Sequence, residues 1–381
     1  MKPIDAIIVG GGVIGSAIAY YMSARGMKVI LLERDRVGSQ ATIAAAGMLA
    51  AQAEITEAGP MFDFARASRA LFPQLETDLR DLTGIDIGLK RKGLLRVAVT
   101  EADVVEIQRT LDFQKTVGEQ ADWLSTEQVR YKEPSISSEI LGAMLIEEDS
   151  QVDAPELCSA FAQAAAVLGA QIVEFTEVKS LLFAHGRING VMTSVEAIYS
   201  DQVIIASGTW SGSLLAQAGL TCPIYPVKGE CYSVLSHVPL VQSTIFSHGC
   251  YLVPKKGGRL VVGATTTAHS YDRKVSLGGI VQLLEAAKRL IPGIVDTEWE
   301  KAWCGLRPQT LDGLPYLGAH PHYKGLYVAA GHYRNGILLS AMTGKLVADW
   351  AEGKIEKNLS LESYRVDRHD NVHCEKESVP S

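Results

Sequence analysis

Three glycines near the start of the chain have the spacing that brings a backbone close to a diphosphate. Gly10, Gly12 and Gly15 form the pattern G-x-G-x-x-G between an apolar run typical of a strand and a periodic run typical of a helix. Gly10 permits a tight turn, Gly12 a close approach to a pyrophosphate, and Gly15 close packing of helix on strand. The phosphates would lie at the positive end of that helix. This pattern predicts a dinucleotide site; a tight turn without a ligand is the alternative.

The acid that follows this pattern narrows the choice of cofactor. Glu33 closes the run VILLER, 23 residues after Gly10, where it can accept hydrogen bonds from a ribose. An acid at this position disfavours a 2′-phosphate and hence NADP. FAD and NAD share the pattern, but small-residue segments recur at 40–49 and 201–212. Each by itself is explained equally well as a buried loop or a strand end. Together they favour the longer FAD.

Three further polar side chains have the chemistry to bind a small carboxylate. Arg307 precedes Pro308, which favours extended backbone and a fixed direction for a guanidinium that can pair bidentately with a carboxylate. The alternative is a surface arginine. Tyr251 lies in a predicted strand and, taken alone, would be a half-buried tyrosine. Arg334 begins an apolar helical pattern with no anion beside it in the sequence. We therefore expect its anion to come from solution.

No arrangement of residues predicts acid or base catalysis. His248 and His332 lie in predicted turns without a carboxylate at close spacing to orient them, which favours a hydrogen-bonding role. An amino acid with a neutral amine can pass its α-hydrogen to a flavin as hydride, so neither histidine is needed. The six cysteines form no C-x-x-C pair and no cluster with histidine. We expect reduced thiols and no metal site.

The bulk composition limits the partners. With 381 residues the chain is expected to form two domains. A net charge of −7 argues against a nucleic-acid or anionic-membrane surface. No apolar run reaches the length of a membrane span, and glycines interrupt the first apolar run, which argues against a signal peptide. A cytoplasmic location is expected.

The elements that must position these residues are predicted from periodicity and turn residues. A βαβ unit is expected over residues 4–34, and a strand at 325–330 precedes Arg334 and a helix. Further helices are predicted at 62–82, 101–117, 153–168 and 277–290; strands at 92–99, 170–178, 188–194 and 197–208; and strands of a second, antiparallel sheet at 230–234, 250–254 and 259–263.

The predicted fold class is α/β with an α+β second domain. A Rossmann-type FAD-binding domain is interleaved with a substrate domain built on a mixed, mainly antiparallel sheet. The cofactor domain is assigned residues 1–85, 150–220 and 305–366, the substrate domain 86–149 and 221–304, and a mobile tail 367–381.

Several segments together resemble a known family. The dinucleotide pattern with Glu33, AAAGML, VIIASGTWSG, GLRPQTLDGLPYLG and GHYRNGILL are similar to the D-amino-acid oxidase family of flavoproteins, and within it to the bacterial glycine oxidases, over residues 5–368. The resemblance implies oxidative deamination of glycine, sarcosine and small D-amino acids with release of hydrogen peroxide. It also implies a homotetramer and a link to thiamine biosynthesis. The surroundings of Cys304 resemble glycine oxidases rather than sarcosine oxidases with covalent flavin, so non-covalent FAD is implied.

The resemblance assigns roles to individual residues. Arg307 would bind the substrate carboxylate, Tyr251 would hydrogen-bond it, and Arg334 would lie beside it at the flavin. Ala50 and Thr265–Thr267 fall in variable segments near the entrance, which leaves the accepted substrate size open. The implied FAD contacts, besides the glycine pattern, are Val13, Ile14, Glu33, Arg34, Ala41, Thr42, Ala46, Gly47, Met48, Val178, His332, Tyr333, Arg334, Asn335, Gly336, Ile337 and Leu338.

Two other functions fit the same residues. A D-amino-acid dehydrogenase would keep the flavin but pass electrons to a quinone, and would form no peroxide. A non-catalytic binding protein of the same fold, as in Rab GDP-dissociation inhibitors, would be colourless, and Arg307 and Tyr251 would have no reason to converge.

Overall fold

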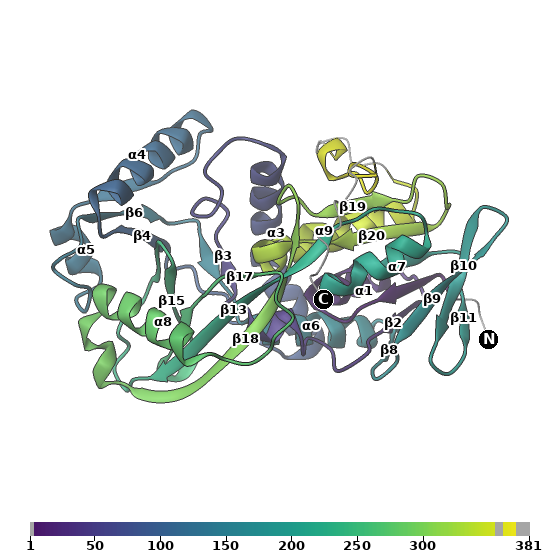
Figure 1. Ribbon diagram of the computed structural model, residues 1–381, viewed down its shortest axis with the longest axis horizontal. Coiled ribbons are helices and arrows are strands. Elements are labelled where there is room, and N and C mark those ends of the chain that lie inside the picture. Colours follow the sequence, from purple (N-terminus) through teal and green to yellow (C-terminus); the bar gives the residue numbers. More distant parts are fainter. Residues whose placement is uncertain (1–3, 355–360, 371–381) are drawn as a thin grey trace, which may run out of the picture.

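The computed structural model describes residues 4–354 and 361–370, and Figure 1 shows two bodies side by side. One body contains β1, β2, β20, α1 and α9; the other contains β4, β6, α4, α5 and α8. The long strands β13 (Ile224–Leu235) and β18 (Glu298–Thr310) run from the second body toward the first. In the described residues no helix is both long and apolar enough to cross a membrane.

The first body is built on a six-stranded sheet in the order β19-β20-β12-β1-β2-β8. All neighbours pair in parallel except the edge strand β19. The predicted βαβ unit is confirmed, with strand, helix and strand in sequence. The bounds are β1 Ala6–Val9, β2 Val29–Leu32, β8 Gln171–Val173, β12 Val203–Ile205, β19 Tyr316–Ala319 and β20 Leu326–Ala330.

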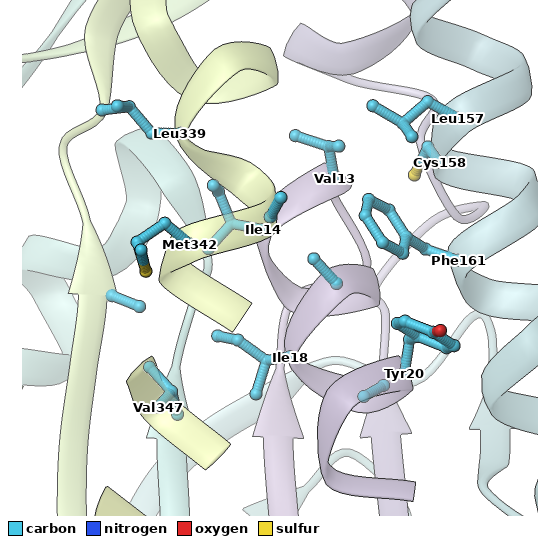
Figure 2. Close-up of a cluster of buried hydrophobic side chains, with 14 of the residues drawn as sticks. Val13, Ile14, Ile18, Tyr20, Leu157, Cys158, Phe161, Leu339, Met342 and Val347 are labelled. Atoms are coloured by element: carbon cyan, nitrogen blue, oxygen red, sulfur yellow. The ribbon is translucent and has the colours of Figure 1, made fainter. Parts of the chain in front are cut away.

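Helices cover this sheet and enclose its core. Figure 2 shows α1 between α6 and α9, with Ile14 and Ile18 toward α9 and Phe161 on the other side. Gly344 of α9 lets the two helices approach closely, because a Cβ there would lie 2.6 Å from the ring of Tyr21. The helices are α1 Val13–Ser23, α2 Ala41–Ala44, α3 Pro60–Thr83, α6 Ala154–Val167, α7 Ser211–Gln217 and α9 Gly336–Ala351.

The second body is built on a nine-stranded sheet in which only the β14–β4 pair is parallel, as the mixed, mainly antiparallel prediction requires. Its remaining elements are β4 Leu94–Ala98, β5 Asp122–Leu124, β6 Gly142–Ile146, β14 Thr244–Ser247, β15 Cys250–Pro254, β16 Arg259–Gly263, β17 Thr267–Ala268, α4 Glu101–Thr116, α5 Thr126–Lys132 and α8 Leu277–Leu290.

Two expectations about strands were wrong. The single strand expected over 197–208 is two strands: β11 (Ala197–Tyr199) joins β9 (Val178–Ala184) and β10 (Arg187–Thr193) in a separate antiparallel sheet, whereas β12 belongs to the six-stranded sheet. The boundary expected after residue 304 cuts β18, which stays paired with β13 through Thr310. A two-stranded ribbon of β3 (Met48–Leu49) and β7 (Ser150–Gln151) completes the strands.

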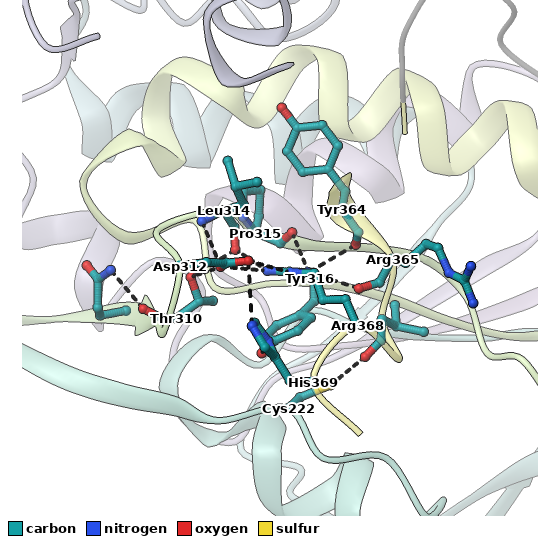
Figure 3. A network of polar contacts seen from close by, with 12 residues as sticks. Cys222, Thr310, Asp312, Leu314, Pro315, Tyr316, Tyr364, Arg365, Arg368 and His369 are labelled. Carbon is teal, nitrogen blue, oxygen red and sulfur yellow. Dashed lines mark hydrogen bonds and ion pairs between the residues drawn. The ribbon is translucent and has the colours of Figure 1, made fainter. Parts of the chain in front are cut away.

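Residues 361–370 pack against the first body, and Figure 3 shows the polar contacts that hold them. Arg368 Nε lies 2.7 Å from Asp312 Oδ2, and its guanidinium stacks on the ring of Tyr316 at 3.9 Å. His369 Nδ1 is 2.6 Å from the Tyr316 hydroxyl. The tail predicted to begin at residue 367 therefore begins too early, and residues 371–381 of that prediction lie outside the described residues.

The close contact of α1 with α9 predicts a steric effect. Gly344→Val should lower the midpoint of urea unfolding at fixed FAD concentration by an amount equivalent to about 1–3 kcal/mol, because the new side chain meets Tyr21 and the backbone of Ala17. Gly278→Ala in α8 is the control, since a Cβ there meets nothing within 4 Å. Equal midpoints for Gly344→Val and the parent protein would contradict the packing described.

Candidate functional site

A long cavity opens where four parallel strands of the first sheet end. Val9, Glu33, Ala206 and Gly331, which lie at or just after the carboxyl ends of β1, β2, β12 and β20, all line it. Ligands of open α/β sheets bind at this edge. The cavity continues to residues of β13, β15 and β18, so both bodies contribute to it.

The glycine pattern has the geometry that a diphosphate needs. Gly10 has a φ of 107°, and a Cβ there would lie 2.6 Å from the carbonyl oxygen of Ala206. A Cβ on Gly15 would lie 1.9 Å from the Gly10 carbonyl, so Gly15 serves helix packing and does not itself line the cavity. Gly12 lines the cavity and would meet only Thr42 Oγ1, at 3.6 Å. Backbone and helix dipole therefore offer an open anion site.

Glu33 is held at the end of β2 by two backbone groups. Its carboxylate accepts hydrogen bonds from Gly11 N at 2.7 Å and Asp35 N at 2.8 Å, and the side chain is buried beside the cavity. Each carboxylate oxygen has a second lone pair, so both can still accept a bond from a ribose hydroxyl. The predicted ribose contact is compatible with this arrangement and stays a prediction.

Tyr251, Arg307 and Arg334 line the same cavity although they come from β15, β18 and η4 (Tyr333–Asn335). Burial raises the pKa of Tyr251 well above its usual value, while Arg307 and Arg334 act in the opposite direction. The hydroxyl therefore stays protonated and can donate a hydrogen bond. Cys231 Sγ lies 3.5 Å from this hydroxyl and was missed by sequence reasoning.

The register of β13 against β18 fixes the direction of Arg307. Gly229 pairs with Gly305, and a Cβ on Gly229 would lie 2.2 Å from Arg307 Nη1, so only glycine leaves room for the guanidinium. Arg307 Nη1 donates to the carbonyl of Thr265 at 3.2 Å. Within the described chain the other guanidinium nitrogens of Arg307 have no hydrogen-bond partner, so donors remain for a carboxylate.

The expectation that Arg334 would find its anion only in solution was wrong. Arg334 Nε lies 3.2 Å from Glu54 Oε2, and this carboxylate is the largest of the causes that raise the pKa of Arg334. Glu54 belongs to the segment between β3 and α3 and also lines the cavity. Because the partners are so far apart in sequence, no local pattern reveals the pair.

The other expectations about the site have mixed outcomes. His332 is buried, its Nε2 lies 3.1 Å from Thr343 Oγ1, and burial lowers its pKa to about 3, so it is neutral and does not act as a cation. His248 is exposed and outside the cavity lining. Leu338, the remaining predicted contact at this turn, is 1% exposed and does not line the cavity, so its contact with the cofactor stays a prediction. The predicted cofactor contacts that do line the cavity are Gly10, Gly12, Val13, Ile14, Glu33, Arg34, Ala41, Thr42, Ala46, Gly47, Met48, Val178, His332, Tyr333, Arg334, Asn335, Gly336 and Ile337.

The cysteines and the entrance residues are also placed. Cys304 Sγ donates to the carbonyl of Arg273 at 3.0 Å and does not line the cavity, which supports non-covalent binding. Five cysteines in the described residues are unpaired thiols, and Cys374 lies outside them. Ala50 lines the cavity, whereas Thr265–Thr267 do not. No group of three or more potential metal ligands occurs in the described part of the chain.

The class of protein follows from comparison with known families. Residues 5–350 match the family DAO, described as FAD dependent oxidoreductase. The chain belongs to this family, which confirms the predicted fold class and the predicted cofactor, FAD.

Individual relatives are similar over nearly the whole chain. A glycine oxidase of Geobacillus kaustophilus (strain HTA426) is 48% identical over 368 residues, 96% of this chain and 97% of that protein. A glycine oxidase of Bacillus subtilis (strain 168) is 39% identical over 369 residues, 97% and 98% of the two chains. The crystal structure of glycine oxidase from Geobacillus kaustophilus superimposes with a TM-score of 0.93 at 47% identity, covering 96% and 98%. This chain is thus an FAD-dependent amino-acid oxidase by family.

Gly12 offers a test of the diphosphate site that leaves folding intact. Gly12→Ala should weaken FAD binding at least about tenfold, because its methyl group occupies space beside the first turn of α1 where phosphate must approach. The measurement is titration of the apoprotein with FAD by flavin fluorescence. Gly293→Ala, where a Cβ meets nothing within 4 Å, should bind FAD like the parent. Equal affinity for Gly12→Ala and the parent protein would exclude this phosphate site.

Proposed function

We propose that this protein oxidises glycine to glyoxylate and ammonia with release of hydrogen peroxide. The observation that carries the proposal is the convergence of Arg307, with unused donors, and the protonated Tyr251 in the cavity that also contains the dinucleotide site. Arg307 and Tyr251 together would bind one small carboxylate at two points. Similarity to glycine oxidases over nearly the whole chain supports the same substrate.

The protein's own residues would bind and orient rather than transfer protons. FAD, when bound, supplies the acceptor for the hydride of the substrate α-carbon and is reoxidised by oxygen. Arg307 and Tyr251 fix the carboxylate, and with it the direction of the Cα–H bond. The first turn of α9, whose Gly336 and Ile337 line the cavity, presents a positive dipole end that favours developing negative charge. The resulting imine hydrolyses in water, so glycine, oxygen and water give glyoxylate, ammonia and hydrogen peroxide.

The range of substrates and the cellular role extend this proposal. Sarcosine and small D-amino acids share the carboxylate and the α-amine that the site would hold. A bifunctional protein ThiO/ThiG of Synechocystis is 36% identical over 91% of this chain, which spans 51% of that protein, and this similarity supports a role in thiamine biosynthesis. Assembly as a homotetramer and a cytoplasmic location stay predictions.

The molar ratio of hydrogen peroxide to glyoxylate formed distinguishes the proposed oxidase from a quinone-reducing dehydrogenase. In air, the purified FAD-loaded protein should form the two products in equal amounts from glycine, because oxygen takes both electrons from the reduced cofactor. Coupled peroxidase and glyoxylate assays on the same samples measure the ratio. If glyoxylate forms without peroxide, and only when a quinone is added, the protein is a dehydrogenase and the proposed oxidase function is wrong. A colourless protein would instead favour a binding role.

Loss of Arg307 should affect substrate binding most strongly. Arg307→Ala removes a charge-assisted bidentate contact worth about 2–4 kcal/mol, so kcat/KM for glycine should fall roughly 30- to 900-fold. Arg307→Lys keeps the charge without the planar fork and should give an intermediate loss. The matched control is Arg289→Ala, an exposed arginine in the last turn of α8 outside the cavity lining. Parent-like kinetics for Arg307→Ala would remove it from the substrate site.

A further inference from the structure

A fully buried carboxylate lies just outside the cavity and is not used in the proposed reaction. Asp149, in the turn before β7, has 0% exposure. Its oxygens accept hydrogen bonds from Gln52 N at 3.2 Å and Ala53 N at 2.9 Å. They also accept from Arg69 Nη1 at 2.6 Å. A buried charge is costly unless such donors surround it, so this arrangement needs a physical account.

The two amides that Asp149 accepts from belong to a segment whose two ends line the cavity. Gln52 and Ala53 lie between Ala50 and Glu54, which both line it. Glu54 in turn pairs with Arg334 at 3.2 Å. The Asp149 carboxylate therefore holds segment 50–54 through two backbone amides of that segment. The same segment places Glu54 beside Arg334.

A polar cluster fixes the other side of this segment. Arg69 of α3 also donates to Gln52 Oε1 at 2.8 Å and pairs with Glu119 at 3.3 Å. Arg66 pairs with the same Glu119 at 2.5 Å. Gln114 of α4 donates to the carbonyl of Gln52 at 3.2 Å. The cluster thus connects segment 50–54 to α3 of the first body and to α4 of the second. Within the described chain, Asp149 is the only member of the cluster that accepts hydrogen bonds from the amides of both Gln52 and Ala53.

We propose that Asp149 is a positioning residue for substrate binding. Its ionised carboxylate holds segment 50–54 so that Glu54 stays paired with Arg334. The substrate carboxylate then binds at Arg307. This inference rests on the proposed function. When the carboxylate takes a proton it loses its charge and part of its acceptor capacity, so the two amide bonds and the ion pair with Arg69 weaken. The wall then loosens, and the KM for glycine rises.

The structure indicates the pH range of this change. Burial raises the pKa of Asp149 to about 6, against the opposing effect of Arg69 and the amide donors. The charged groups around it are Arg69, and beyond it Arg66 and Glu119. Because the folded protein binds this proton more tightly than an unfolded chain would, protonation of Asp149 does not lower the free energy of unfolding. A rise in KM below about pH 6 is therefore separable from acid unfolding.

A variant is needed to assign the transition to Asp149, because a second group near the cavity also titrates in this pH range. Burial lowers the pKa of Lys255 to about 7, and its Nζ lies close to Gly47 of the cavity lining, 3.3 Å from where a Cβ on that glycine would be. Because the amine of glycine also gains protons as the pH falls, the two FAD-loaded proteins are compared at each pH: the KM of Asp149→Asn divided by that of the parent should be about ten near pH 8 and about one near pH 5, with a midpoint near 6. Asp149→Asn should show the raised KM over the whole range and no midpoint near 6. Peroxide formation measures both.

Two further variants keep the test decisive if Asp149→Asn folds poorly. Arg69→Gln removes the cation that opposes protonation, so the KM midpoint should move to higher pH. Lys115→Gln removes an exposed charge of α4 that pairs with Asp112 outside the cluster, and it should keep the parent midpoint. A KM ratio between Asp149→Asn and the parent that stays constant across this range, or an unmoved midpoint in Arg69→Gln, overturns the positioning role only. Absence of peroxide from glycine in the parent overturns the proposed function itself.

Discussion

The antiparallel pairing of β13 with β18 is the interaction on which the cavity depends. Twelve and thirteen residues long, these strands form one ladder from Ile224 opposite Thr310 to Leu235 opposite Glu298, with a single shift of register between Ser233 and Val234. β18 packs against α2, η1 (Gly208–Trp210) and η4 of the first body, while β13 packs against α8 of the second. A single ladder therefore sets the distance between the cofactor end and the substrate end, and its register alone gives Arg307 the space over Gly229.

Arg307 and Arg334 differ in the groups of the chain that already neutralise them. Among the residues that the structure describes, Arg334 has a carboxylate partner, whereas Arg307 has a backbone carbonyl as its only hydrogen-bond partner and keeps donors for an incoming anion. Tyr251 adds a neutral donor because burial keeps its pKa high. This asymmetry gives the site one strong position for a carboxylate instead of two, which suits a substrate with a single carboxylate and little else.

Sequence patterns predicted the parts of the fold that are local. The βαβ unit, α3, α6 and α8 follow from periodicity, caps and turn residues that lie within each segment. Membership of a sheet is not local, so residues 197–208 were expected to form one strand although β11 and β12 belong to different sheets, and the domain boundary was placed inside β18. In the site, residue types pointed to Tyr251 and Arg307. The pairing of Arg334 with Glu54 and the buried Asp149 depend on contacts between distant segments, which no spacing rule reveals.

The strand order of the first sheet has a consequence for biosynthesis. β12 lies between β1 and β20, so an edge of β1 stays unpaired until residue 205 has been made, and an edge of β12 until residue 330. Pairings of such long sequence separation form slowly and leave open strand edges that other chains can join. Expression is therefore expected to depend on chaperone capacity, and no single cut in the chain releases either sheet as a unit that folds alone.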